Sequence, residues 1–280
     1  MADRGDLRRR IAADIWTSHN IELDHDLCTI PGSPGFFATD TRLAAVRRML
    51  RARFGDDSSN LRIADLGCLE GGFAIALSLD GATVVGLEAR RANLDKAQLV
   101  RQWFGLDSLT LMEADVKDFD VERFGRFDVV LALGILYHLD RPAAWLRQVG
   151  EATTTMLIVD THVAPPSEAR RLQLRADIRE LSEVEAEMHL ERAYPGRWYS
   201  EYSSDICEAQ REQQLWASWS NHRSFWLTEQ SLLRALRDAG FDLVLQQHDA
   251  TLDGHERNRY EFSRGMFVAI KSSARQADPL

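Results

Sequence analysis

The chain of 280 residues predicts an α/β fold built on a doubly wound, mostly parallel sheet of seven strands with an antiparallel last strand. Three observations favour this fold. Short β-branched runs alternate with segments of helical spacing between residues 62 and 160. A glycine-rich turn at 67–72 joins the first of these runs to the next helical segment. The last two apolar runs have no helical segment between them, as is usual for antiparallel neighbours.

The strands are expected where apolar, β-branched runs end at glycine or at a polar residue. The predicted strands are 62–66, 83–87, 109–112, 127–133, 155–160, 241–246 and 265–271. Helices are predicted over 72–79, over 93–104, after Asp140 with Pro142 in the first turn, and after the capping residue Thr228. The run at 127–133 is apolar at almost every position, which is typical of a strand that is covered on both faces.

Residues 1–60 are predicted to form an N-terminal helical extension. A helix is expected over 6–16 because three apolar residues share one of its faces, namely Leu7, Ile11 and Ile15. A Pro-Gly loop follows at 31–35. Asp40 is then placed to cap a second helix, which Gly55 would end.

The alternation of strands and helices stops at Pro165 and Pro166, and residues 165–227 are predicted to be an insert. A helix with one packed face is expected early in it, from the spacing of Leu174, Ile178, Leu181, Val184 and Met188. Aromatic residues gather in the rest, namely Tyr194, Trp198, Tyr199, Tyr202, Trp216, Trp219, Phe225 and Trp226. We expect a helical, aromatic lid within a main domain at 61–271, followed by a tail at 272–280.

The composition limits the partners and the compartment. The chain has 34 basic and 43 acidic residues and a net charge of −9, which argues against broad nucleic-acid binding because such binding neutralises phosphates. The three cysteines are sparse and form no C-x-x-C pair, as in a reducing cytoplasm. No run of eighteen apolar residues occurs. We expect a cytoplasmic protein with no membrane partner, for which a homodimer is possible.

The turn Gly67-Cys-Leu-Glu-Gly-Gly72 is the strongest chemical signal in the chain. Glycine lets the backbone approach a ligand closely, and the helix after the turn presents unpaired N–H groups. A dinucleotide site needs the spacing G-x-G-x-x-G to admit a pyrophosphate, whereas Leu69 occupies the second of these glycine positions. S-adenosylmethionine has no phosphate, and Asp65 beside the turn suits its ammonium group. The turn therefore favours S-adenosylmethionine over a dinucleotide.

Two further carboxylates follow the next two strands. Glu88 ends the second predicted strand, where a carboxylate accepts hydrogen bonds from both ribose hydroxyls of a nucleotide. Asp115 follows the third strand, where it can accept from an adenine amino group, with backbone contacts from Ala114 and Val116. Because ligands of such sheets bind outside the carboxyl ends of the strands, these residues predict one adenosyl site.

Residues 61–164 resemble the class I S-adenosylmethionine-dependent methyltransferase family. The strings that carry the resemblance are Ala64-Asp-Leu-Gly-Cys-Leu-Glu-Gly-Gly72, Val85-Gly-Leu-Glu-Ala89, the strand at 127–133 with its Leu-Tyr-His-Leu139 ending, and Asp160-Thr-His-Val-Ala164. That ending is similar to a branch with bacterial small-molecule and glycan methyltransferases and wobble-uridine tRNA-modifying enzymes. The resemblance implies a Rossmann-like fold and S-adenosylmethionine as cofactor, although the family's usual glycine at Leu69 is absent. The cofactor-binding residues expected from these signals are Asp65, Gly67, Cys68, Glu70, Gly71, Glu88, Ala89, Ala114, Asp115, Val116, Leu133 and Gly134.

Methyl transfer to a hydroxyl needs a group that takes the proton, and histidine is suited to this at pH 7. Tyr137 and His138 follow the fourth predicted strand, and His162 follows the fifth. His222 in the insert could bring a further base over the site. Which histidine is the base stays open. Asp160 and His162 could begin a divalent-metal site, but no third ligand is spaced for it, so we predict no metal.

The leading hypothesis is a methyltransferase that modifies a small molecule or glycan at oxygen, as in natural-product or sugar biosynthesis. Its partner would be that acceptor, with nucleic acid not expected. One alternative is a tRNA wobble-uridine modifying transferase. A second is an NAD(P)-dependent oxidoreductase on a similar sheet, and a third is a binding module that keeps the fold without catalysis.

Overall fold

The computed structural model describes residues 3–175, 180–202, 207, 210, 213–214, 217–247 and 262–272. The chain divides into two compact units, Met1–Val116 and Lys117–Leu280. Within the described ranges, no helix combines the length and the apolar character that crossing a membrane requires.

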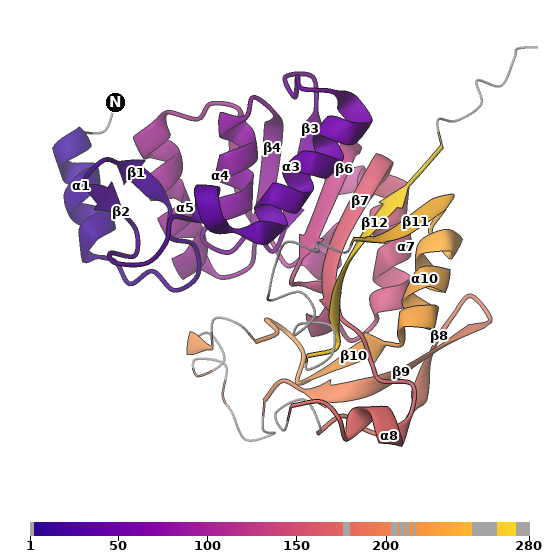
Figure 1. Cartoon of the computed structure of the whole chain (residues 1–280). Coiled ribbons are helices and arrows are strands. Elements are labelled where there is room, and N and C mark those ends of the chain that lie inside the picture. Colours follow the sequence, from indigo (N-terminus) through magenta and orange to yellow (C-terminus); the bar gives the residue numbers. More distant parts are fainter. Residues whose placement is uncertain are drawn as a thin grey trace, which may run out of the picture. The chain divides into compact units, whose positions relative to one another are not determined.

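The first unit contains three parallel strands in the order β3-β4-β5 (Figure 1). The strands and their helices are β3 (Arg62–Leu66), α4 (Gly72–Leu79), β4 (Thr83–Glu88), α5 (Arg91–Phe104) and β5 (Leu109–Glu113). Their bounds agree with the predictions to within two residues. Register pairs Asp65 with Gly86 and Glu88 with Glu113, so the carboxyl ends of the three strands lie at one edge.

Residues before β3 form α1 (Arg4–Ala13), β1 (Glu22–Asp24), β2 (Leu27–Cys28), α2 (Phe36–Thr39) and α3 (Thr41–Phe54). The predicted cap of α3 is confirmed, because Asp40 accepts hydrogen bonds from the N–H groups of Arg42 and Leu43. Gly55, with φ 87°, ends the helix as predicted. The prediction that Ile15 belongs to the apolar face of α1 is wrong. The helix ends at Ala13, and the Ile15 side chain is 78% exposed. The short hairpin of β1 and β2 was not predicted.

Four strands of the second unit lie in one sheet, in the order β11-β12-β7-β6 (Figure 1). They are β6 (Phe127–Leu133), β7 (Thr153–His162), β11 (Leu243–Gln247) and β12 (Arg264–Ile270). β6 and β7 are parallel, whereas β12 is antiparallel to both β7 and β11. Together the two units supply the seven predicted strands, and the mostly parallel, Rossmann-like class with an antiparallel last strand is confirmed.

The helices of the second unit are η1 (Val116–Asp118, which begins one residue before the unit), α6 (Val121–Phe124), η2 (Leu136–His138), α7 (Pro142–Ala152), α8 (Glu168–Arg171) and α10 (Glu229–Asp238). Thr228 caps α10 as predicted, since its side chain accepts from the Ser231 N–H. The predicted cap of α7 is wrong. Arg141 is the residue before that helix, and Asp140 instead pairs with Lys117 at 3.1 Å.

The prediction of a helix with one packed face over 174–188 is wrong where the structure describes it. Besides the four-residue α8, the described part of the insert contains a three-stranded antiparallel sheet of β8 (Glu185–His189), β9 (Arg192–Ser200) and β10 (Arg223–Leu227). Val184 and Met188, assigned to a packed helix face, are 45% and 58% exposed, and Ile178 lies outside the described residues. The hairpin turn at Leu190 and Glu191 has positive φ at both residues but neither glycine nor asparagine, so no sequence signal marks it.

Candidate active site

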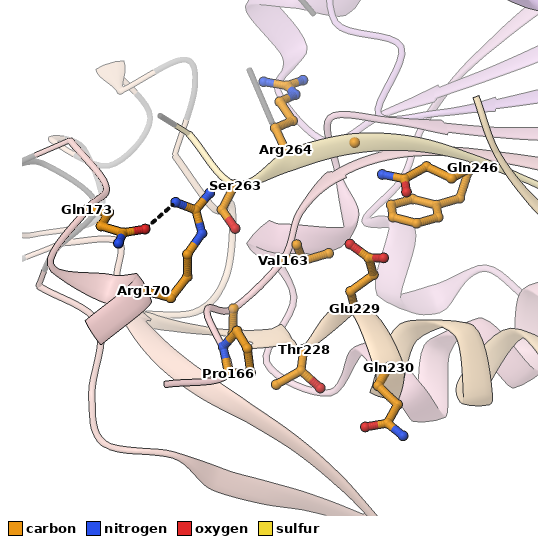
Figure 2. Close-up of a pocket in the computed structure, with 13 residues that line it drawn as sticks. Val163, Pro166, Arg170, Gln173, Thr228, Glu229, Gln230, Gln246, Ser263 and Arg264 are labelled. Atoms are coloured by element: carbon orange, nitrogen blue, oxygen red, sulfur yellow. Dashed lines mark hydrogen bonds between the residues drawn. The ribbon is translucent and has the colours of Figure 1, made fainter. Parts of the chain in front are cut away.

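A cavity of about 680 Å³ lies in the second unit, a size that suits a small molecule (Figure 2). Its walls come from the ends of β7 and β12, from α8 and from the start of α10, with residues such as Val163, Arg170, Glu229 and Ser263. At one side of the cavity, the Arg170 guanidinium donates a hydrogen bond to Gln173 Oε1 at 3.1 Å. None of the residues predicted for catalysis or cofactor binding lines it.

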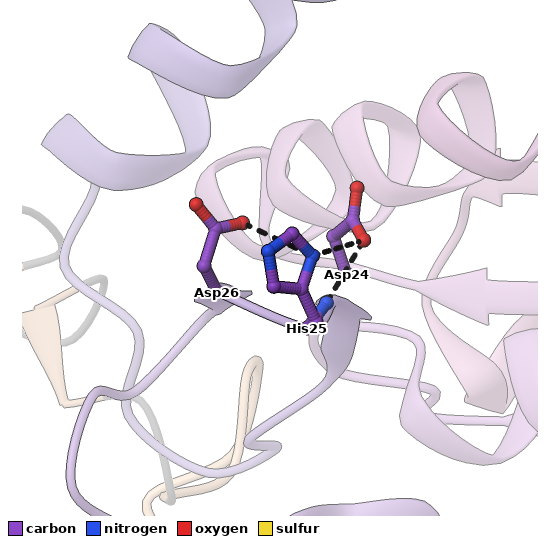
Figure 3. Close-up of side chains that lie close together, drawn as sticks. All are labelled: Asp24, His25 and Asp26. Carbon is purple, nitrogen blue, oxygen red and sulfur yellow. Dashed lines mark hydrogen bonds and ion pairs between the residues drawn. The ribbon is translucent and has the colours of Figure 1, made fainter.

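Asp24, His25 and Asp26 bring three metal-ligand atoms close together in the hairpin of the first unit (Figure 3). All three side chains are exposed, and Arg8 pairs with Asp26 at 2.7 Å. The described residues hold no other such group, so Asp160 and His162 are not part of one. An exposed, arginine-paired cluster of this kind carries no argument for a bound metal.

The glycine turn after β3 adopts a conformation that needs its glycines. Gly67 and Gly71 have φ of 73° and 83°, in the left-handed region. Leu69 has φ 53° although it is not glycine, and its N–H donates to Glu88 Oε2 at 3.0 Å. The N–H groups of Gly67 and Cys68 both donate to the Leu87 carbonyl. The turn is therefore hydrogen-bonded to the last two residues of β4.

Two buried carboxyl groups lie at this edge of the sheet. Glu88 also accepts from the Arg90 N–H at 2.8 Å, and burial raises its pKa. Burial raises the pKa of Asp65 to about 7, with a further increase from the charge of Glu88, while a backbone hydrogen bond from Ala74 opposes it. Asp65 Oδ2 is buried without a hydrogen-bond partner among the described residues. An acceptor in that state fits a ligand that brings a donor, such as an ammonium group.

The third predicted strand end lies at the same edge. The Ala114 N–H donates to the Glu88 carbonyl at 3.1 Å, which joins the residues after β5 to the end of β4. Asp115 and Ala89 are half-buried, and Val116 is buried. The structure thus brings the three predicted carboxylates, Asp65, Glu88 and Asp115, to neighbouring strand ends of one unit. Cys68 in the turn is a buried thiol whose pKa is raised well above its usual range by that burial.

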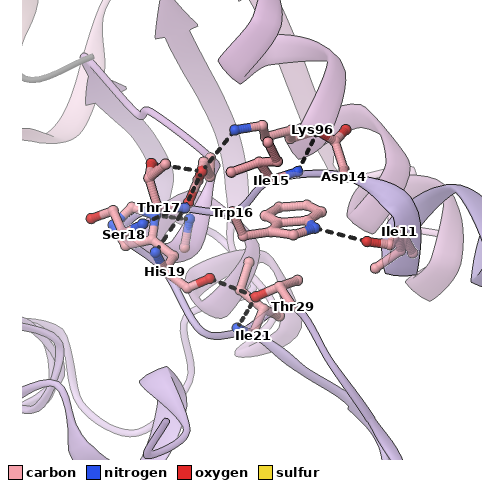
Figure 4. Close-up of polar contacts among 12 residues, drawn as sticks. Ile11, Asp14, Ile15, Trp16, Thr17, Ser18, His19, Ile21, Thr29 and Lys96 are labelled. Atoms are coloured by element: carbon pink, nitrogen blue, oxygen red, sulfur yellow. Dashed lines mark hydrogen bonds and ion pairs between the residues drawn. The ribbon is translucent and has the colours of Figure 1, made fainter. Parts of the chain in front are cut away.

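The Glu70 side chain holds the N-terminal segment against the turn. Figure 4 shows Thr17, Ser18 and His19 of that segment. Glu70 is fully buried and accepts hydrogen bonds from the backbone of Thr17, Ser18 and His19, from the Thr17 hydroxyl, and from Lys96 Nζ at 3.1 Å. We call Thr17–His19 with Glu70 the N-terminal clasp. The sequence contained no signal for this contact, because its partners lie more than fifty residues apart.

His19 extends the clasp to the helix. Its Nδ1 accepts from the Gly72 N–H at 3.0 Å, so the first N–H of α4 is not free, contrary to the prediction. Burial, with a contribution from Arg42, lowers the pKa of His19 to about 4, which keeps the ring neutral at pH 7. A Cβ on Gly72 would lie 2.6 Å from the His19 ring. Glycine is therefore required here for close approach.

In the second unit, the end of β6 lies next to a partly buried ion pair. Gly134 has φ 88°, and its N–H donates to the Asp160 carbonyl at 2.9 Å. The Asp160 carboxylate accepts two hydrogen bonds from the Arg264 guanidinium, at 3.0 and 2.7 Å. The guanidinium also lies over the Tyr137 ring at 5.4 Å. Leu133 and Gly134 are half-buried, as is Tyr137.

His138 is paired with a carboxylate that the sequence reasoning missed. Its Nδ1 lies 2.9 Å from Glu201 Oε1, and the Glu201 side chain is 2% exposed. Glu201 also accepts from the Ser224 hydroxyl and from the Ser218 N–H. Burial raises the pKa of Glu201, but the hydrogen bonds from His138, Ser224 and Ser218 outweigh it and leave that pKa lowered. Glu201 is therefore ionised at neutral pH.

The other two predicted histidines have different surroundings. His162 stacks on Trp226 with ring centres 4.7 Å apart, and its Nδ1 donates to the Phe262 carbonyl at 2.8 Å. Burial and the nearby Arg264 charge lower the pKa of His162 to about 4. His222 is exposed, and its ring packs edge-on against Tyr202 at 6.2 Å.

Residues 39–246 match the family described as "Methyltransferase domain". A ubiquinone biosynthesis O-methyltransferase of Pseudomonas syringae pv. tomato is 34% identical over 101 residues, which cover 35% of this chain and 43% of the relative. The corresponding protein of Azorhizobium caulinodans is 32% identical over 132 residues, covering 43% and 50%. The chain thus spans half or less of the length of these curated relatives.

A solved structure resembles the fold over nearly the whole chain. The N-terminal domain of EvdMO1, determined in the presence of SAH and D-fucose, superposes with a TM-score of 0.68 at 24% identity. The superposition covers 97% of this chain and 98% of that domain. At this identity the likeness shows the shared fold.

Proposed function

Since the chain belongs to the family of methyltransferase domains, we propose that it transfers the methyl group of S-adenosylmethionine to a hydroxyl of a small molecule or glycan. The observation that carries this proposal is the pair of buried carboxyl groups, Asp65 and Glu88, beside the left-handed glycine turn. One oxygen of this pair, Asp65 Oδ2, still lacks a donor among the described residues.

The residues at this edge suit the parts of S-adenosylmethionine. Glu88 would accept from the ribose hydroxyls and Asp65 from the ammonium group, while Asp115 with the backbone of Ala114 and Val116 would hold the adenine. The sulfonium supplies an electrophilic methyl group. The Glu70 side chain is occupied by the N-terminal clasp, so its part would be to shape the turn.

The two leading alternatives receive less support from the chain. A dinucleotide pyrophosphate needs a glycine where Leu69 stands, and a leucine side chain would occupy the place of the phosphate. A tRNA substrate would need a basic surface, whereas the net charge is −9. The O-methyltransferase names of the curated relatives and the D-fucose of the solved domain both favour an oxygen acceptor on a small molecule. A reducing cytoplasm is the proposed setting, because all three cysteines are free thiols.

Calorimetric titration with S-adenosylhomocysteine tests the cofactor assignment. The wild-type protein should bind it, and Glu88→Ala should weaken binding by about tenfold or more, since hydrogen bonds to a charged group are lost. Glu113→Ala is the matched control, because Glu113 is the register partner of Glu88 on β5 but its side chain is 51% exposed. NAD⁺ should give no heat of binding. Equal affinity in all three proteins, or binding of NAD⁺ alone, would refute the proposal.

A further inference from the structure

We propose that His138 is the proton acceptor of the methyl-transfer reaction and that Glu201 is the residue that positions it. This inference rests on the proposed function and adds to it the identity of the base and of a residue that holds the base. The insert supplies Glu201, which directly follows β9, and the other residues that fix the base.

The hydrogen bond to Glu201 sets the tautomer of His138. An ionised carboxylate only accepts hydrogen bonds, so the 2.9 Å contact must be donated by His138 Nδ1–H. In the neutral ring Nε2 then carries the lone pair and can take a proton. The negative charge of Glu201 also stabilises the positive charge that the ring acquires on doing so. Carboxylate and imidazole thus have the arrangement of an oriented general base.

The insert also fixes the backbone that carries His138. The backbone turn that carries His138 is η2 with Leu139 after it, and three successive carbonyls in it accept hydrogen bonds from the insert. The Tyr137 carbonyl accepts from Trp226 Nε1 at 2.9 Å, and the His138 carbonyl accepts from Asn221 Nδ2 at 3.1 Å. The Leu139 carbonyl accepts from the Phe225 N–H at 2.7 Å. Asn221 in turn donates to the Ser224 hydroxyl and accepts from that of Ser218. The residues that hold the backbone of the turn therefore belong to the same network that holds Glu201.

His162 is less suited to the same task. It is neutral at pH 7, but a ring whose pKa is lowered to about 4 is a weak proton acceptor there. Its Nδ1–H is donated to a neutral carbonyl, which cannot stabilise the imidazolium as a carboxylate does.

A dedicated base identifies the acceptor as a group that is protonated at neutral pH. The acceptor oxygen forms a bond to the methyl carbon while the carbon–sulfur bond breaks with its electron pair left on sulfur. The hydroxyl proton passes to His138 Nε2 and then to solvent, so the net products are the methyl ether, S-adenosylhomocysteine and one proton. A carboxylate acceptor would already be ionised and would need no base. A base at this position therefore agrees with the alcohol or phenol hydroxyl of the proposed function.

The test compares matched variants in methyl transfer from labelled S-adenosylmethionine to a panel of catechol, 3,4-dihydroxybenzoate, D-fucose and D-glucose. His138→Gln should lower kcat by about 10²–10⁴-fold with unchanged affinity for S-adenosylhomocysteine. Glu201→Gln should give a smaller fall in kcat, also without a change in that affinity. Glu187→Gln is the control, because Glu187 is another buried insert carboxylate but accepts from the backbone of Ala143 and Ala144. It should keep the wild-type kcat.

Two further readouts separate a chemical role from a structural one. Added imidazole should restore part of the activity of His138→Ala and none of that of His162→Ala. Nitrogen NMR of histidine-labelled protein should show His138, assigned by its loss in His138→Gln, protonated at Nδ1 and not at Nε2 at neutral pH.

Each outcome decides between the two proposals. Wild-type protein that does not bind S-adenosylhomocysteine overturns the proposed function itself. Protein that binds it but methylates no member of the panel overturns the alcohol or phenol class. An Nε2–H tautomer, or a His138→Gln kcat equal to that of Glu187→Gln, overturns the roles of His138 and Glu201.

Discussion

The glycine-turn region of the first unit and the insert region of the second unit both contain a buried glutamate that gathers backbone and side-chain donors. Glu70 holds the N-terminal clasp, and Glu201 holds the turn that carries His138. The two glutamates differ in the groups that donate hydrogen bonds to them. The donors around Glu70 are all groups of the N-terminal clasp and Lys96, whereas Glu201 accepts from His138 Nδ1, and no hydrogen bond to Nε2 of that ring is seen among the described residues. Burial of a carboxylate alone therefore does not mark a catalytic residue, and the identity of its partner does.

The largest effect on stability is expected for Glu70→Ala. This change leaves the Lys96 ammonium, which is 7% exposed, without its carboxylate, and it removes the acceptor for three backbone N–H groups. We expect a loss of about 3–5 kcal/mol in the free energy of unfolding, as for other broken buried pairs. Urea denaturation measures it, and Glu113→Ala, at an exposed position, is the control. A loss below about 1 kcal/mol would show that the clasp is not held by Glu70.

A pH-dependent effect of intermediate size is expected for His162. Its pKa is lowered to about 4 in the folded protein from 6.5, so between these values the unfolded chain binds the proton more readily. The stability that neutral His162 contributes is complete above pH 6.5 and is lost as the pH falls towards 4, by up to about 3 kcal/mol. His162→Phe, which keeps an aromatic ring against Trp226, should reduce the loss of stability between pH 7 and pH 4.5. An unchanged pH dependence in this variant would contradict the assignment.

The smallest effect is expected for Leu69→Gly. Leu69 has φ 53°, a conformation that costs an L-residue about 1–2 kcal/mol, while glycine adopts it freely at an entropic cost of about 0.5–1 kcal/mol. The variant should therefore be as stable as the wild type or more stable by up to about 1 kcal/mol. Thermal unfolding measures the change, with Leu190→Gly in the insert hairpin, where φ is 48°, as the matched comparison. A destabilisation of both variants would show that side-chain packing outweighs the backbone strain.

The sequence predicted the parts of the molecule whose signals are local. The strands at 62–66 and 127–133 and the helix at 72–79 have their predicted bounds, because apolar patterning and the adjacent glycines specify them within a few residues. The carboxylates at the strand ends follow from the same local pattern. The cap at Asp40 was also predicted from a single residue and its neighbours.

The remainder depends on contacts between distant residues. The apolar spacing of 174–188 suggested a helix, but β8 is stabilised by pairing with β9 through a turn without a glycine signal. Glu201 and His138 are 63 residues apart, and Glu70 and Thr17 are 53 apart. No pattern within one segment reports such partners. The contacts of Glu201 and Glu70 could therefore be recognised only in the folded structure.

One calorimetric series tests two proposed roles together. Glu88 is proposed to bind the cofactor, whereas Glu201 is proposed to position His138 for proton transfer and not to bind the cofactor. The dissociation constant of S-adenosylhomocysteine is measured for Glu88→Ala and for Glu201→Gln beside the wild type. We expect weaker binding by about tenfold or more in the first variant and no change in the second. Unchanged binding in Glu88→Ala together with a loss in Glu201→Gln would contradict it.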